Sequence, residues 1–183
     1  MAQLKAKKIT VNGKEIETCT SGKLLGLNIN STGFTSHITK TVNKGIGVLA
    51  QLRRFRNLTP KLKTTLIKTL LIPVLEYPTI PICMASITQK RKLQTVLNKA
   101  IRFIHCNEEE YLNTEQLHRK YNITPLNITN YYKARRTWET IRISETEQYE
   151  ELVTERDNNH TWFPKSSAII TMGEPQAIIT RQT

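Results

Sequence analysis

Lysines and arginines are the side chains of this sequence with the clearest chemical use. The stretch RKLQTVLNKAIRFI, residues 91–104, carries four of them, and Lys90 stands directly before it. Ammonium and guanidinium groups bind phosphate oxygens through charge-assisted hydrogen bonds. A helix over this stretch would bury an apolar face and turn its cations to solvent. The pattern therefore predicts a phosphate-binding surface built on helices.

We expect the phosphate contacts to come from the outer faces of several helices, along one shared track. The predicted contact residues are Lys40, Lys44, Arg53, Arg54, Arg56, Lys61, Lys63, Lys99 and Arg102. Such contacts position a nucleic acid without reading its sequence. The alternative for each cation is an ordinary solvated helix face.

The net charge of the chain supports a polyanionic partner. It is +12 over 183 residues. Residues 1–106 carry +15, residues 107–142 carry +1 and residues 143–183 carry −4. A segment this basic is typical of proteins that meet nucleic acid, either as binding modules or as structural components of ribonucleoproteins.

Residues for catalysis or metal binding are sparse. A two-metal phosphoryl-transfer site needs carboxylates that converge on ions roughly 4 Å apart, yet the single aspartate, Asp157, lies in the acidic tail. The basic half has only Glu15, Glu17 and Glu76. The four histidines are far apart, without a metal-binding spacing. We therefore expect no catalysis and no cofactor from this chain alone.

The sequence carries no sign of secretion or of a membrane anchor. No apolar run reaches the roughly 18 residues of a membrane span, and the start MAQLKAKKIT has no apolar signal segment. The three cysteines cannot all pair with one another and form no CxxC motif. These features favour a nuclear or cytoplasmic protein that does not associate with membranes.

Short strands are predicted before residue 33. Residues 8–19 alternate apolar and polar side chains on both sides of Asn12-Gly13, which favours a β hairpin. Residues 23–30 resemble a third strand, in which Gly26 suggests a bulge or a close backbone approach.

Helical periodicity dominates from Thr35 onward. Helices are expected over about residues 35–56, 60–74, 88–104, 114–121 and 125–143, with Pro73 kinking or ending the second and residues 77–86 irregular. The apolar stripes of the first three should pack together as a bundle. They are Ile38, Val42, Ile46, Leu49 and Leu52 or Phe55; Leu62, Leu66, Ile67, Leu70, Leu71 and Val74; and Leu93, Val96, Leu97, Ala100, Ile101 and Ile104.

These elements give a mainly helical α+β chain in three segments. Residues 1–33 form the hairpin and strand segment, residues 34–144 form a bundle of three long helices with one or two more, and residues 145–183 form an acidic, weakly ordered tail.

Four stretches follow one another within residues 8–143: KLLGLNIN with His37-Ile38, IPVLEY, RKLQTVLNKAIRFI and YNITPLNITNYYKARRTWETI. In this order they resemble the end of the palm and the thumb of reverse transcriptases from non-LTR retrotransposons, especially the jockey-like group. KLLGLNIN with His37-Ile38 is similar to the family's "YLGV" strand and "HI" run. IPVLEY, residues 72–77, is similar to "RPvLeY", and RKLQTVLNKAIRFI to "kLqrvQNkalRii". YNITPLNITNYYKARRTWETI resembles the segment that follows in the family. Ile72 and Leu97 depart from the family's Arg and Gln.

The resemblance implies a thumb-like segment that holds a template–primer duplex beside an upstream palm and fingers. It places Leu25 and Gly26 in a primer-grip-like position, and it assigns magnesium and the catalytic aspartates to the parent RNA-directed DNA polymerase rather than to this chain. Two alternatives stay open: an RNA- or ribonucleoprotein-bound structural protein, and a protein-interaction module derived from such an element. In the latter, Trp138, Trp162 and Phe163 would anchor a partner.

Overall fold

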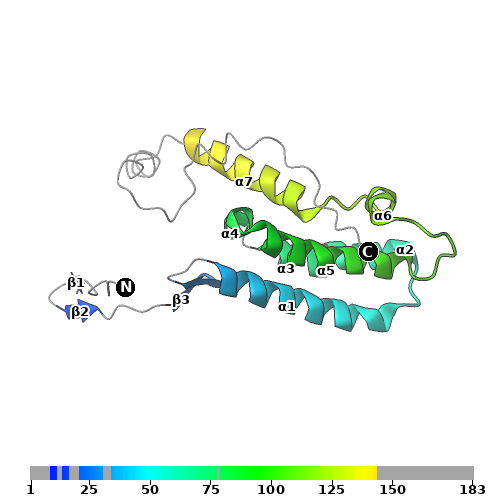
Figure 1. Ribbon diagram of the computed structural model, residues 1–183, viewed down its shortest axis with the longest axis horizontal. Helices are drawn as coiled ribbons and strands as arrows, with labels where there is room; N and C mark the ends of the chain where they lie inside the picture. Colours follow the sequence, from blue (N-terminus) through cyan, green and yellow to red (C-terminus); the bar gives the residue numbers. More distant parts are fainter. Residues whose placement is uncertain (1–8, 12–13, 17–20, 31–33, 78, 144–183) are drawn as a thin grey trace.

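The computed structural model describes residues 9–11, 14–16, 21–30, 34–77 and 79–143. Two short β hairpins come first, and helices make up the rest of the described chain (Figure 1). The prediction of a mainly helical α+β fold with an N-terminal hairpin is confirmed. The proposed tail, residues 145–183, lies outside the described residues, as do Trp162 and Phe163.

The first hairpin pairs β1 (Ile9–Val11) with β2 (Lys14–Ile16) in antiparallel register. Val11 lies opposite Lys14, so the connection has two residues, as the Asn-Gly signal predicts.

The single strand expected over residues 23–30 is wrong, because the chain reverses direction within it. β3 (Ser21–Leu24) and β4 (Leu27–Asn30) form a second antiparallel hairpin that turns at Leu25 and Gly26. The φ angles of these two residues are 46° and 83°, so Gly26 serves a tight turn rather than a bulge. A leucine in left-handed backbone costs about 1–2 kcal/mol. The Tyr77 hydroxyl helps to hold this turn by donating a hydrogen bond to the Leu25 carbonyl, at 2.5 Å.

The chain runs along α1 away from the second hairpin and then returns along α2 to α3 (Figure 1). α1 spans Thr35–Leu52 and continues into a 3₁₀ turn, η1, at Arg53–Phe55. α2 (Pro60–Leu66), a π-helical segment η2 (Ile67–Leu71) and α3 (Ile72–Glu76) follow one another without a break. Pro73 therefore does not end the helix. It lacks an N–H group, and the wider π turn comes directly before it.

Four more helices follow: α4 (Thr79–Met84), α5 (Ile87–His105), α6 (Thr114–Lys120) and α7 (Leu126–Ile143). The irregular passage expected over residues 77–86 is wrong in part, since it contains α4. Ser86 caps α5 through a capping box with Gln89, so the helix begins one residue before the predicted start at residue 88. Asn113 caps α6 through a capping box with Gln116.

The core lies where α1, the α2–α3 segment and α5 meet, and α7 packs against α4 and α5. The α5 stripe is buried as predicted, with every member at most 3% exposed. The other two stripes are partly wrong, because Ile46, Leu62 and Leu70 are about half exposed. Of the two alternatives for the end of the first stripe, Leu52 is buried and Phe55 is about half exposed. In the α2–α3 segment the buried row is instead Lys63, Ile67, Leu71 and Leu75.

Candidate nucleic-acid interface

Eight of the nine predicted phosphate contacts are exposed. They are Lys40, Lys44, Arg53, Arg54, Arg56, Lys61, Lys99 and Arg102. They lie on α1, on the turn between α1 and α2, at the start of α2 and on α5. The prediction that they turn away from the core is confirmed for these eight. Their arrangement as one shared track stays a prediction.

The cations of α1 follow one face of the helix. Lys40, Lys44 and Arg54 recur at helical spacing, opposite the face that carries Ile38 and Leu49 into the core. Lys40 also donates a hydrogen bond from Nζ to Oδ1 of Asn28, at 2.9 Å, and so ties β4 to α1.

Exposed cations are densest where α1 meets α2. We call residues 53–61 the α1–α2 corner. It holds Arg53, Arg54, Arg56 and Lys61, and the ring of Phe55 lies among them with 49% of the residue exposed. Asn107, in the loop after α5, donates from Nδ2 to the carbonyl of Arg56 at 2.8 Å. That contact fixes the corner to the end of α5.

The two predicted contact residues on α5 differ in their surroundings. Arg102 donates from Nη2 to Oγ1 of Thr114 at 3.2 Å, so its guanidinium lies near the start of α6. Lys99 is exposed one turn earlier.

Pairing with carboxylates separates two groups of cations. Arg119, Lys120, Lys133 and Arg135 each form an ion pair with a glutamate. None of the eight exposed cations named above pairs with a carboxylate anywhere in the part of the chain that the structure describes.

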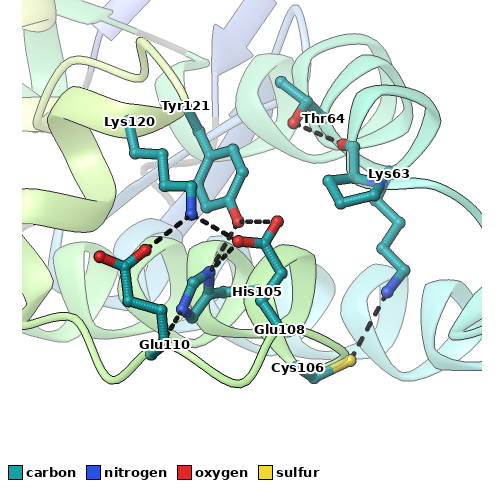
Figure 2. A network of polar contacts seen from close by, with 9 residues as sticks. Lys63, Thr64, His105, Cys106, Glu108, Glu110, Lys120 and Tyr121 are labelled. Atoms are coloured by element: carbon teal, nitrogen blue, oxygen red, sulfur yellow. Dashed lines mark hydrogen bonds and ion pairs between the residues drawn. The ribbon is translucent and has the colours of Figure 1, made fainter.

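Lys63 contradicts the prediction, because the whole residue is buried. Its Nζ atom lies 3.6 Å from Sγ of Cys106 (Figure 2). The same atom lies 5.3 Å from the centroid of the Phe103 ring. The helical row that buries Ile67 and Leu71 passes through Lys63 and carries it beneath α5. Lys63 thus offers no surface for phosphates.

The turn at Leu25 and Gly26 is exposed at the end of the second hairpin. Leu25 is 86% exposed, and the ring of Tyr77 lies 3.6 Å from where a Cβ would stand at Gly26. The geometry leaves the turn accessible, and its primer-grip-like role stays a prediction.

A polar network at the end of α5, not foreseen from the sequence, joins the α5–α6 loop to α6 (Figure 2). Lys120 binds the carboxylates of Glu108 and Glu110, while His105 contacts the Tyr121 hydroxyl at 2.8 Å and the Glu110 carbonyl at 2.5 Å. The hydrogen bond from Lys120 lowers the pKa of Glu108. The same bond raises the pKa of Lys120. Two carboxylates thus face one ammonium group, so this network offers no net positive charge to a phosphate.

A second network, buried and also unforeseen, lies between α5, α6 and α7. Gln94 donates from Nε2 to Asn98 at 2.8 Å and contacts Nε2 of His118 at 3.3 Å. Gln94 also accepts the Leu126 N–H at 2.9 Å, and His118 Nδ1 lies 2.6 Å from the Ile123 carbonyl. Because that carbonyl can only accept, Nδ1 carries the hydrogen of the neutral ring and Nε2 accepts from Gln94. Burial lowers the pKa of His118.

The described residues do not fit the magnesium site that the resemblance assigns to the parent polymerase. No three His, Cys, Asp or Glu side chains among them come together as metal ligands. Glu76, one of the few carboxylates of the basic half, is buried and paired with Lys133.

None of the described helices is long and apolar enough to cross a bilayer.

Comparisons with known proteins leave the family open. No protein-family model matches the chain, and neither the curated proteins nor the solved structures contain a significant match.

Proposed function

We propose that this chain binds nucleic acid through the phosphate backbone, as the thumb-like segment of a non-LTR retrotransposon reverse transcriptase. Its exposed cations hold a template–primer duplex, while a palm and fingers from the parent polymerase supply magnesium and the chemistry. The chain is not catalytic alone.

The single observation that carries this proposal is the set of exposed cations that have no carboxylate partner among the described residues. A cation held by a glutamate must give up that partner to bind a phosphate, whereas an unpaired exposed cation need not. The unpaired group lies between Lys40 and Arg102, in the same half of the chain that carries the net positive charge.

Contacts between the stretches that resemble the family give further support. Tyr77 of IPVLEY donates a hydrogen bond to the Leu25 carbonyl of KLLGLNIN, 52 positions earlier. Within the first stretch, His37 Nδ1 accepts the Asn28 N–H at 3.3 Å. IPVLEY and KLLGLNIN therefore contact each other in the fold, as expected if they belong to one ancestral element.

The test is the salt dependence of binding. Fluorescence anisotropy with a labelled RNA–DNA hybrid and a DNA duplex should show log affinity falling against log salt with a slope of about −5, for roughly six neutralised phosphates. Affinity without a salt slope would favour the protein-interaction module. A primer-extension assay on the chain alone should give no product.

Matched double variants make the test specific to the unpaired cations. Arg54→Gln with Lys61→Gln should reduce the size of the salt slope by about two. Arg119→Gln with Arg135→Gln removes the same charge from ion-paired positions and should leave the slope nearly unchanged. An equal decrease of the salt slope in both double variants would contradict a defined interface. It would mean that binding depends only on the net charge of the chain.

A further inference from the structure

The α1–α2 corner combines four exposed cations with Phe55, a half-exposed aromatic residue that was one of two alternatives, beside Leu52, for the end of the first apolar stripe. Leu52, three residues before Phe55, is 3% exposed, so the apolar row of α1 ends there and the 3₁₀ turn swings Phe55 outward. An isolated exposed apolar residue is ordinary. Here, however, Arg53, Arg54 and Arg56 adjoin Phe55 in the sequence, and all three are exposed.

The backbone that carries Phe55 is held in place. Its carbonyl accepts the Leu58 N–H at 3.1 Å, which closes a tight turn. Asn107 holds the next carbonyl, that of Arg56, from the α5–α6 loop. A fixed ring loses less conformational entropy when a ligand stacks on it than a mobile one does.

Nearby acidic groups do not occupy these cations. Glu108 and Glu110 follow Asn107 closely in the sequence, but both carboxylates bind Lys120. Glu109 is exposed and forms no ion pair with the corner among the described residues. Arginines near a helix C-terminus do stabilise the helix dipole, yet that role explains neither Phe55 nor Lys61 at the start of the next helix.

We propose that the α1–α2 corner binds an unpaired strand of nucleic acid, with one base stacked on Phe55 and the flanking phosphates held by the arginines and Lys61. This inference rests on the proposed function and adds a site for a single-stranded extension of the duplex. Bases inside a duplex already stack on one another, whereas an unpaired base has a free face for an aromatic ring. Stacking and phosphate contacts are shared by RNA and DNA, so the corner accepts either.

The experiment compares three probes by fluorescence anisotropy: a blunt duplex, the same duplex with a single-stranded extension, and the single strand, each as RNA and as DNA. Phe55→Ala should lower the affinity for the extended duplex and the single strand by about tenfold, and change blunt-duplex affinity less than about twofold. Phe55→Tyr keeps a stacking ring and should retain the wild-type affinities.

Ile46→Ala is the matched control, since Ile46 lies on the same helix and is 48% exposed. It should leave all three affinities unchanged, and circular dichroism should show that each variant folds. Loss of affinity for all probes alike in Phe55→Ala, or no loss for any, would overturn the corner as a single-strand site. If no probe binds with a salt slope, the proposed function itself fails. If the duplex binds with a slope but Phe55→Ala behaves as wild type, only this inference fails.

Discussion

The Nζ atom of Lys63 lies 3.6 Å from the Sγ atom of Cys106, beneath α5 and out of contact with water. No carboxylate in the described part of the chain pairs with this ammonium, and its other neighbour is the face of Phe103. A buried charge without a strong partner costs free energy, because neither a thiol nor a ring replaces its hydration fully.

We predict that Lys63→Met leaves the free energy of unfolding unchanged or raises it by about 1–3 kcal/mol, because methionine fills a similar volume without a charge. Urea unfolding followed by circular dichroism measures the change. Lys61→Met, two positions earlier and exposed, should not affect stability but should weaken nucleic-acid binding. A clear loss of stability in Lys63→Met would mean that the contacts of the ammonium outweigh its desolvation.

The two glycines of α1 should respond in opposite ways to alanine. A Cβ at Gly45 would lie 2.6 Å from Cδ2 of Leu75, itself buried in the core, and 3.4 Å from Cγ1 of Val96. Gly45→Ala should therefore lower the free energy of unfolding by about 1–3 kcal/mol through overpacking. At Gly47 nothing lies within 4 Å, so Gly47→Ala should raise it by up to about 1 kcal/mol through helix propensity. Thermal and urea unfolding of both variants would check the signs, and a stabilised Gly45→Ala variant would contradict the packing.

The segment from Pro60 to Glu76 shows how far periodicity reaches. Its apolar residues fall on two adjacent rows of the helix surface, and their periodicity predicts that both rows are buried in the core. The fold buries the row through Ile67 and Leu71 and leaves Leu62 and Leu70 half exposed. The choice depends on where α5 lies, which local spacing does not encode. The same choice determines that Lys63 is internal while Lys61 is not.

Only part of the candidate interface could be predicted from the sequence. Exposure of Arg54 or Lys99 follows from helical spacing alone, since each lies opposite an apolar stripe. The lack of carboxylate partners among the described residues does not follow from it, because partners such as those of Lys120 and Lys133 could be found only once the helices were packed. The network of Gln94 and His118 joins residues 24 positions apart, and no local pattern marks it.

Two buried histidines should make the fold sensitive to mild acid. Burial lowers the pKa of His37 and of His118 below the ordinary value of 6.5. The unfolded chain therefore binds protons at these positions more readily than the folded chain does, and stability rises with pH where the two states differ. This contribution is present above about pH 6.5 and is lost as the pH falls through the folded-state pKa values.

Urea unfolding at about pH 7.5 and about pH 5 should show lower stability at the acid end. Glu108 does not contribute in this window, because its pKa is lowered from 4.5. His118→Gln should reduce the pH dependence, although it also weakens the fold at neutral pH. NMR titration of the His118 ring in the wild type gives the direct reading, and protonation at or above pH 6.5 in the folded state would contradict the buried neutral ring.

Asn130 offers a test of a buried amide that the fold leaves without hydrogen bonds. Its side chain is 1% exposed, and within the described residues neither Oδ1 nor Nδ2 has a hydrogen-bond partner. Such a group costs about 1–3 kcal/mol, so Asn130→Leu, which is close in size, should raise the free energy of unfolding by about that amount. Gln94→Leu removes an amide that is bonded to Asn98, and it should lower stability by a similar amount. Urea unfolding at neutral pH measures the free energy of unfolding of both variants. If Asn130→Leu is destabilised as Gln94→Leu is, the Asn130 amide has a stabilising partner of its own.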